Sequence, residues 1–321
     1  MPTYQKFALI LASNYPGTTF QLGGCIVDAE RMRNFLVTQR GFPASNITTI
    51  YNMSMTKAGI LKAFDDMVAR SKSIAATGDI PAFFLHYSGH GTRVWNSNKR
   101  SLETFTGRQA LPPDGFNDSD GDEALVPQDV RSKGLLLDDE INDRLVKRLH
   151  PSTQLFALTD CCNSGSNLDL SYQGLSKVTS IGDQTPSIIH VAGSRDSQLS
   201  AEIASGGVAT TRLLQVLTKS PKTVPELQNQ MGDLSSAYNA QHPQVSVSKS
   251  SLVQGTLFPW IVSNLPANTV VKRPIATPEI VLDPKVPAVI STSTPIPIRA
   301  QRPIMTITLS LDLLKNFLPL K

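Results

Sequence analysis

The sequence predicts an α/β fold, a three-layer sandwich in which helices cover both faces of a mostly parallel, six-stranded sheet. Short apolar runs alternate with segments of helical periodicity along most of the chain. Glycine and proline residues separate these segments. The composition, with 40% hydrophobic and 17% charged residues, is typical of a globular protein.

The first half of the chain predicts three strands and two helices. Residues 7–13 form a continuous apolar run, which indicates a buried strand. Residues 46–52 and 81–91 predict two more strands by their β-branched and aromatic content. Between the strands, residues 25–42 and 56–71 carry apolar side chains at helical spacing. This order implies right-handed crossovers and parallel strands.

The second half continues the alternation. The predicted elements are a helix at 137–149, strands at 153–160 and 187–193, helices at 206–218 and 223–241, and a closing strand at 255–260. Parallel sheets place their chemistry at the carboxyl ends of the strands. His90 follows the third strand and Cys162 follows the fourth, so we expect the two side chains to be neighbours.

Charge and proline content divide the chain at about residue 262. Residues 263–321 hold nine of the 22 prolines and carry the whole net charge of +4, which predicts a flexible, Pro-rich tail. Residues 1–262 sum to zero, which argues against nucleic-acid binding. Residues 111–143 hold ten acids and two bases, a field that suits a cation or a basic substrate; a solvated acidic loop is the alternative.

The sequence also predicts a location. The first residues lack the layout of a signal peptide, and no apolar run is long enough for a membrane span. Three cysteines, an odd number, argue against a disulfide framework and for a reducing compartment. We therefore expect a monomer in the cytoplasm, with the nucleus as a second location, and no membrane partner.

The stretch DCCNSG places Cys161 and Cys162 side by side after the fourth predicted strand. A disulfide between adjacent residues is strained, and with Cys25 as the only other cysteine the spacing does not suit zinc. A phosphatase loop needs an arginine shortly after its cysteine, where this chain has Asn167 and Leu168. A buried core cysteine and a nucleophile remain as alternatives.

The two alternatives suit different cysteines. Cys161 still belongs to the strand and can face the interior, whereas the small polar residues after Cys162 turn the chain outward. His90 stands between two glycines in YSGHGT, and glycine lets backbone approach a ligand and leaves N–H groups accessible. A histidine there can take a proton from a thiol, while the Gly91 N–H faces a developing oxyanion.

These motifs resemble those of the metacaspases, a family of caspase-like cysteine peptidases. HYSGHG is similar to the family's histidine motif, and LTDCCNSGS is similar to its cysteine motif. The resemblance also covers NYPGTTFQLGGCIVDAERMRNFL, DSDGDEALVPQD, LLLDDEI, AGSRDSQLSAE and GTLFPW, from about residue 5 to 260. It implies a caspase-like peptidase domain at 1–262, with a large-subunit-like region at about 1–180 and a small-subunit-like region at about 185–262.

The resemblance assigns roles by position. It implies a Cys/His dyad with Cys162 as nucleophile and His90 as base, and backbone N–H groups of Gly91 and Cys162 as the oxyanion hole. It also implies an acidic pocket that selects protein or peptide substrates with Arg or Lys before the cleaved bond. The residues that match this substrate-binding pocket are Asp28, Ser88 and Asp160. Two carboxylates around one basic side chain make charge-assisted hydrogen bonds, which agrees with that specificity.

Many metacaspases need calcium, so the resemblance also implies a Ca²⁺ site that stimulates the enzyme without entering the chemistry. The matching acids are Asp122, Asp138, Asp139 and Asp169, a set of hard oxygen ligands that suits calcium. An EF-hand is excluded because Glu123 stands where its turn glycine belongs. The alternative is a solvated acidic patch.

The chain also departs from the family pattern. Asn163 replaces the usual histidine after the nucleophile, and Val27 replaces an asparagine in the N-terminal signature. Residues 93–117 are longer than usual, and the Pro/Gln-rich pro-region of many type I members is absent, so we expect a type I-like member without it. We expect activity to survive, the alternative being a non-catalytic interaction scaffold with the tail as its docking arm.

Overall fold

The computed structural model describes residues 2–94, 122–161, 164–178, 182–193, 202–203, 206–232 and 242–263. Its main sheet has the strand order β2-β1-β3-β7-β10-β13-β8-β9. These strands are β1 (Tyr4–Ala12), β2 (Ile47–Tyr51), β3 (Ile80–Ser88), β7 (Gln154–Asp160), β8 (Tyr172–Gln173), β9 (Ser176–Lys177), β10 (Ser187–Ala192) and β13 (Gln244–Val247).

Two small sheets, eight α-helices and three short 3-10 helices complete the described fold; the 3-10 helices are Ala44–Asn46, Asn52–Ser54 and Val146–Arg148. The three-stranded sheet contains β4 (Gly91–Val94), β5 (Asp122–Leu125) and β6 (Leu136–Leu137), and the two-stranded one contains β11 (Glu202–Ile203) and β12 (Gly206–Gly207). The helices are α1 (Cys25–Arg40), α2 (Lys57–Ala76), α3 (Val130–Lys133), α4 (Asp138–Arg144), α5 (Val208–Thr218), α6 (Val224–Met231), α7 (Ser250–Val253) and α8 (Pro259–Val262). Within the described ranges, no helix is long and apolar enough to cross a bilayer.

The main sheet confirms the predicted α/β class. Strands β2, β1, β3, β7 and β10 run parallel, and β13 pairs antiparallel with β10. The chain passes from β1 through α1 to β2 on one side of β1, and returns through α2 to β3 on the other side. The winding therefore reverses between β1 and β3, which is where open α/β sheets bind their ligands.

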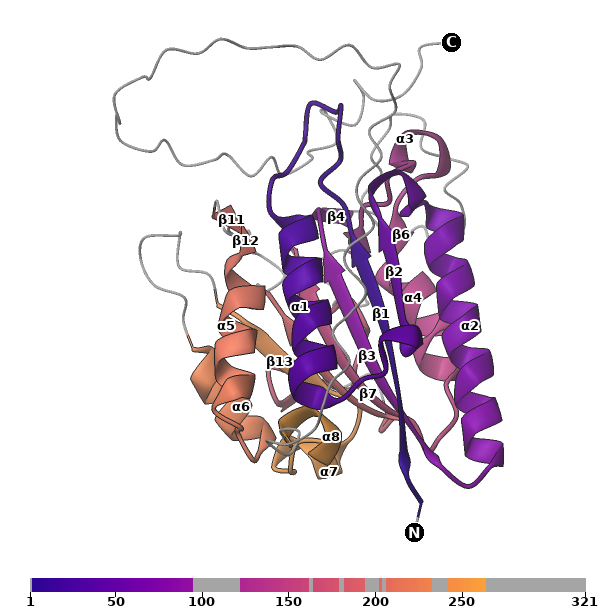
Figure 1. The fold of residues 1–321 in the computed structure, drawn as a ribbon, viewed down its shortest axis with the longest axis vertical. Helices are drawn as coiled ribbons and strands as arrows, with labels where there is room; N and C mark the ends of the chain where they lie inside the picture. Colours follow the sequence, from indigo (N-terminus) through magenta and orange to yellow (C-terminus); the bar gives the residue numbers. More distant parts are fainter. Residues whose placement is uncertain are drawn as a thin grey trace, which may run out of the picture.

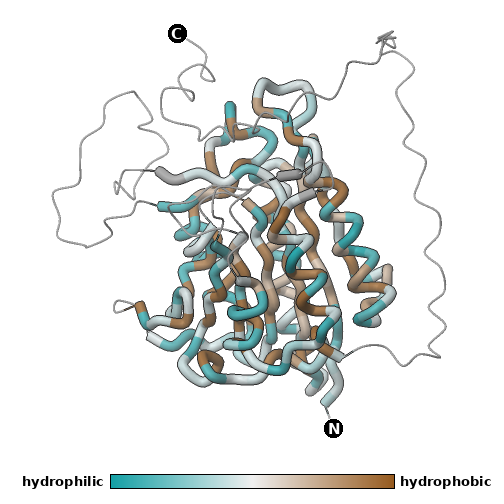
Figure 2. The backbone as a smooth tube through the Cα atoms, turned by 90° about the vertical axis from the view of Figure 1, so that its left-hand side faces the viewer, coloured by the Kyte–Doolittle hydropathy of each residue, from teal (hydrophilic) through white to brown (hydrophobic). Residues whose placement is uncertain are grey.

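Helices cover both faces of this sheet, as predicted (Figure 1). Alternate residues of β1 point to opposite cores, so Leu9 and Leu11 pack with α2 and α4 while Ala8 and Ile10 pack with α1, α5 and α6. Figure 2 shows apolar strands inside and polar stretches on the outer helices. This two-sided burial explains why the strands read as continuous apolar runs.

One predicted strand is wrong. Residues 255–260 form an isolated bridge at Thr256 and the start of α8, because Pro259 occupies the first turn of a helix. The sixth strand in the order of the main sheet is β13, in a stretch for which no strand was predicted, and the two-residue strands β8 and β9 bring the sheet to eight strands instead of the predicted six. The predicted helix at 223–241 is shorter, since α6 ends at Met231 before Gly232.

The register between β3 and β7 brings two motif-bearing strand ends together. Ser88 at the end of β3 pairs with Asp160 at the end of β7. The Gly89 N–H also donates to the Asp160 carbonyl, with 3.4 Å between nitrogen and oxygen. The predicted proximity of the ends of the third and fourth predicted strands is thus confirmed, whereas the meeting of the His90 and Cys162 side chains stays a prediction. The predicted nucleophile Cys162 lies outside the described residues. So do residues 95–121 and 264–321, which hold most of the long stretch expected at 93–117 and of the Pro-rich tail expected at 263–321.

Candidate active site

Two buried tyrosines fix the backbone around His90. The His90 N–H donates to the Tyr15 hydroxyl at 3.0 Å, and the Tyr87 hydroxyl donates to the His90 carbonyl at 2.7 Å. Tyr15 also donates to the Val126 carbonyl at 2.7 Å, and the two hydroxyls lie 3.1 Å apart. Both tyrosine side chains are fully buried. The loop after β3 is therefore tied to the segment that follows β1 and to the residue that follows β5.

Gly89 is required by this arrangement. A Cβ atom at position 89 would lie 2.8 Å from the Tyr15 hydroxyl oxygen and 2.9 Å from the Tyr87 hydroxyl oxygen. Real Cβ atoms do not approach oxygen so closely, so only glycine lets both hydroxyls reach the His90 backbone. The glycine before the histidine in the YSGHGT motif thus has a packing reason as well as a conformational one.

The His90 ring is oriented by a backbone carbonyl. Its Nε2 lies 2.7 Å from the Phe20 carbonyl oxygen, and because a carbonyl only accepts, Nε2 must carry a proton. The Tyr15 and Phe20 rings pack against the imidazole with centroids 4.8 and 5.6 Å away. In the neutral ring Nδ1 is then the basic atom. Burial lowers the pKa of His90, and the hydrogen bond to Phe20 opposes this effect.

The contacts of Tyr15 predict that its hydroxyl stabilises the fold. Tyr15→Phe removes the acceptor of the buried His90 N–H and the donor to the Val126 carbonyl. We expect a loss of about 1–3 kcal/mol in the free energy of unfolding, because both groups stay buried without this partner. Urea denaturation measures it, with Tyr172→Phe as a control that loses one hydrogen bond, to Asp183, nearer the surface. Equal losses in both variants would contradict the assigned role.

The Gly91 N–H points away from its neighbouring strand. Gly91 pairs with Leu125 in the antiparallel β4–β5 ladder, and the Val126 N–H donates to the His90 carbonyl at 3.2 Å. This pattern makes Gly91 and Leu125 a non-hydrogen-bonded pair, whose N–H groups face outward from the ladder. The Gly91 N–H is therefore not used by this ladder, as an oxyanion donor requires.

Cys161 is a core residue. Its side chain is 2% exposed and packs in the apolar cluster beneath α2 and α4. The Asn167 side-chain amide donates to its sulfur at 3.5 Å. The interpretation of Cys161 as the structural member of the cysteine pair is therefore confirmed, while the role of Cys162 stays a prediction.

Asp28, Ser88 and Asp160 come together at the carboxyl end of the sheet. Asp28, in the first turn of α1, accepts the Gly207 N–H at 2.6 Å and lies 3.4 Å from the Ser88 hydroxyl through Oδ2. Asp160 Oδ2 accepts the backbone N–H and the hydroxyl of Thr210 at 2.8 and 2.7 Å. Both carboxylates are buried, 1% and 5% exposed.

The charges of the two acids act on each other. Burial raises the pKa of Asp28, and the neighbouring Asp160 charge raises it further. The Gly207 N–H, Arg31 and Ser88 oppose the shift. Two buried carboxylates whose charges repel each other make a place where a cation is strongly favoured, because its charge offsets both desolvation and mutual repulsion.

Glycines line this acidic pair. A Cβ at Gly207 would lie 2.1 Å from Asp160 Oδ2 and 2.9 Å from Asp28 Oδ2. A Cβ at Gly193 would lie 3.1 Å from Asp160 Oδ1. The backbone therefore approaches both carboxylates more closely than any side chain would permit.

The acids predicted to bind calcium come together only in part. The Asp138 carboxylate accepts the Glu123 N–H at 3.0 Å and the Asp139 N–H at 2.8 Å. Burial raises its pKa first, and the charges of Asp122 and Asp139 raise it further, so these three acids lie near one another. The Asp169 carbonyl accepts from Asn142 of the same helix α4 at 3.2 Å. Among the residues that the structure describes, no group of three or more His, Cys, Asp or Glu is arranged to hold a metal.

Sequence reasoning missed several contributors to the site. The Phe20 carbonyl orients His90, Thr210 holds Asp160, and Arg31 lies 3.9 Å from Asp28. His86 is fully buried, and its Nε2 lies 3.3 Å from the hydroxyl of Thr210, which in turn bonds Asp160. The glycine pair at 206–207 was the signal available, since two glycines before a helix favour a close backbone approach.

Comparison with known proteins agrees with this geometry. The family model for the metacaspase, peptidase C14 domain matches residues 6–171. Metacaspase-1 of Plasmodium falciparum is 32% identical over 241 residues, which span 69% of this chain and 36% of that protein. Metacaspase-1 of Eremothecium gossypii is 28% identical over 314 residues, 77% of this chain and 64% of that protein. The chain therefore spans less than two thirds of the length of these relatives.

A solved structure shares the fold. A protein of Geobacter sulfurreducens superimposes with a TM-score of 0.55 at 21% sequence identity, covering 82% of this chain and all of that chain. At this identity the likeness concerns the fold alone. The family model covers more than half of the chain, in the segment that carries His90, Asp28 and Asp160. On this evidence the chain belongs to the metacaspase family of peptidase C14 domains.

Proposed function

We propose that this protein is a cysteine endopeptidase that cleaves protein or peptide chains after Arg or Lys. Family membership supports the reaction class. The observation that carries the specificity is the buried pair of Asp28 and Asp160, which accept the backbone N–H groups of Gly207 and Thr210. A basic side chain between the two carboxylates makes charge-assisted hydrogen bonds with both, whereas an acidic side chain there meets like charge.

The proposed chemistry is acyl transfer by a Cys/His dyad. His90 accepts the Cys162 thiol proton at Nδ1, because its Nε2 proton is held by the Phe20 carbonyl. The thiolate attacks the substrate carbonyl carbon, and the oxygen that becomes negative is met by the Gly91 N–H. His90 then donates the proton to the leaving amine, and water hydrolyses the acyl-enzyme.

The environment of His90 suits the role of base. Burial lowers its pKa, so the ring is neutral at neutral pH and ready to accept a proton. No carboxylate of the described residues is needed to orient the imidazole, since the Phe20 carbonyl and the Tyr15 ring do so. In the proposed dyad, the Phe20 carbonyl takes the orienting role that a carboxylate has in a catalytic triad.

An arginyl chloromethyl ketone tests the function directly. We expect it to alkylate the protein stoichiometrically at Cys162 and to abolish cleavage of Arg-ended fluorogenic peptides. An aspartyl chloromethyl ketone serves as the matched control and should react far more slowly, because Asp28 and Asp160 repel it. No labelling by either reagent would favour the non-catalytic scaffold.

We also propose that calcium stimulates this peptidase. The support is the gathering of Asp122, Asp138 and Asp139, whose charges act on one another at the start of α4. No three-ligand group is already assembled in the described part of the chain, so no step of the chemistry is assigned to the ion. Binding would instead draw these carboxylates together, because calcium prefers several oxygen ligands.

The calcium proposal predicts a loss of activity on chelation. We expect EGTA to lower the rate of peptide cleavage at least about tenfold, and excess Ca²⁺ but not Mg²⁺ to restore it. Asp139→Asn should weaken the calcium response, and Asp143→Asn is the matched control, since Asp143 pairs with Lys147 at the surface. Cleavage rates that do not change with EGTA would refute the calcium requirement.

A further inference from the structure

The two oxygens of Asp28 have unequal surroundings. Oδ2 accepts the Gly207 N–H at 2.6 Å and faces the Ser88 hydroxyl at 3.4 Å. Oδ1 is buried and has no hydrogen-bond partner among the described residues. A buried carboxylate oxygen without a hydrogen bond is costly unless a positive charge is near. The guanidinium of Arg31 supplies that charge, with Nη1 3.9 Å from Oδ1.

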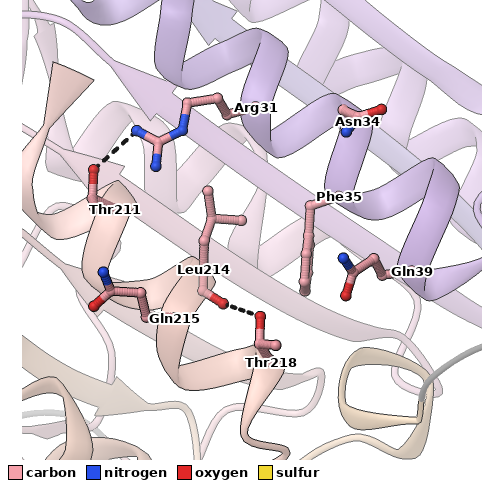
Figure 3. Close-up of a pocket in the computed structure, with 8 residues that line it drawn as sticks. All are labelled: Arg31, Asn34, Phe35, Gln39, Thr211, Leu214, Gln215 and Thr218. Atoms are coloured by element: carbon pink, nitrogen blue, oxygen red, sulfur yellow. Dashed lines mark hydrogen bonds between the residues drawn. The ribbon is translucent and has the colours of Figure 1, made fainter. Parts of the chain in front are cut away.

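Arg31 is held in place from its other side by α5. Its Nη1 donates to the Thr211 hydroxyl at 3.0 Å (Figure 3). The Thr211 hydroxyl in turn donates to the Gly207 carbonyl at 2.9 Å. Since the Gly207 N–H binds Asp28, the four residues form a closed ring of contacts that joins α1, β12 and α5.

This ring of contacts lies between the solvent and the buried acids. Arg31 lines a hollow of about 310 Å³ between α1 and α5, shown in Figure 3. Its side chain is 36% exposed, whereas that of Asp28 is 1% exposed. Arg31 is the charged residue among those lining the hollow. Arg31 also lines a second hollow, together with Glu30.

We propose that Arg31 is a positioning residue of the substrate pocket, which favours the ionised form of Asp28 and orients its carboxylate to receive a basic side chain. The 3.9 Å separation matters, because Arg31 provides charge without donating a hydrogen bond to Oδ1. That oxygen stays available for the guanidinium or ammonium group of a substrate. This inference rests on the proposed function, since it assigns Arg31 a part in the same specificity.

The groups around Asp28 define the expected pH dependence. Burial and the Asp160 charge raise the pKa of Asp28, while the Gly207 N–H, Arg31 and Ser88 lower it. Loss of Arg31 should therefore raise the pKa further. Because only the ionised carboxylate binds a cation well, affinity for a basic substrate should fall as the pH drops through that pKa. Without Arg31 this fall should begin at a higher pH.

The direct test is a ¹³C NMR titration of the Asp28 carboxyl, assigned by its loss in Asp28→Asn. We expect Arg31→Gln to raise the measured pKa by about one unit, and Arg31→Lys to raise it less. Arg33→Gln is the matched control, with the same change of charge on the same helix, and should leave the pKa of Asp28 unchanged. Equal values in wild type and Arg31→Gln would overturn the inference, whether or not the protein is a peptidase.

Kinetics then separate the two proposals. Below the pKa of Asp28 we expect Arg31→Gln to raise the KM for Arg-ended peptides about tenfold, with kcat unchanged, and the difference should narrow at higher pH. A loss confined to kcat would contradict a positioning role in substrate binding. The pKa of Asp28 could differ between wild type and Arg31→Gln although the wild type cleaves no basic peptide. That result would refute the proposed function but not the electrostatic role of Arg31.

Discussion

Cys162→Ala is expected to abolish cleavage of Arg-ended peptides, with a loss in kcat of at least about a thousandfold. The reason is that alanine has no group that can form the acyl-enzyme. Cys161→Ala should retain most of the activity, because its sulfur is buried in the core and bonded to Asn167. Cys161→Ala should instead lower the free energy of unfolding by about 1 kcal/mol.

Two measurements on the same pair of variants check this expectation. Steady-state kinetics on an Arg-ended fluorogenic peptide give kcat, and urea denaturation gives the free energy of unfolding. Cys162→Ala should unfold like the wild type, so that lost activity cannot be attributed to misfolding. Activity that vanishes in Cys161→Ala and persists in Cys162→Ala would show that the other thiol is the nucleophile.

Gly207→Ala is expected to disable the substrate pocket. The new Cβ would lie 2.1 Å from Asp160 Oδ2, so either the backbone or the carboxylates must move. Moving the backbone removes the N–H that donates to Asp28 at 2.6 Å, a hydrogen bond to a charged group. Such bonds contribute about 1.5–3 kcal/mol, so the KM for Arg-ended peptides should rise roughly 10- to 100-fold.

Gly182→Ala is the matched control, since a Cβ at that position meets nothing within 4 Å. Its kinetics should equal those of the wild type. Circular dichroism and thermal unfolding show whether Gly207→Ala still folds, and binding of agmatine, which carries a guanidinium group, reports on the pocket without catalysis. Unchanged agmatine affinity in Gly207→Ala would show that the close glycine approach does not shape the acidic pair.

Much of the fold could be predicted because its strands are buried on both sides. In β1, alternate residues face two different cores, so the run is apolar throughout and reads as a strand. The position predicted for the sixth strand was wrong, because the real strand lacks such an apolar run. β13 has four residues, QVSV, with polar side chains that give no strong signal, whereas the apolar residues near Trp260 pack α8 against the core.

The residues of the candidate site also fall into those that the sequence could predict and those that it could not. Motif residues such as His90 and Asp28 could be assigned from the sequence because their types and spacing resemble a known family. The groups that control them could not, because they act through the backbone or across long separations. Phe20 contributes only its carbonyl, which no residue type encodes. Arg31 meets Thr211 across 180 positions, a contact that only the packing of α1 on α5 creates.

One departure from the family pattern, at Val27, lies among the described residues, and its surroundings bear on activity. Val27, which replaces an asparagine of the signature, is 44% exposed on α1. The substitution therefore leaves the packing of the core unchanged, and its neighbour Asp28 keeps its contacts with Gly207 and Ser88. This supports an intact substrate pocket despite the altered motif.

The central claim is that a reactive thiol and the His90 ring meet above an acidic pair that holds a basic side chain. A crystal structure of the adduct with an arginyl chloromethyl ketone tests it most directly. We expect the inhibitor on Cys162 Sγ, His90 Nδ1 within about 3–4 Å of that sulfur, and the guanidinium between Asp28 and Asp160. An inhibitor attached elsewhere, or a guanidinium that contacts neither carboxylate, would contradict the account.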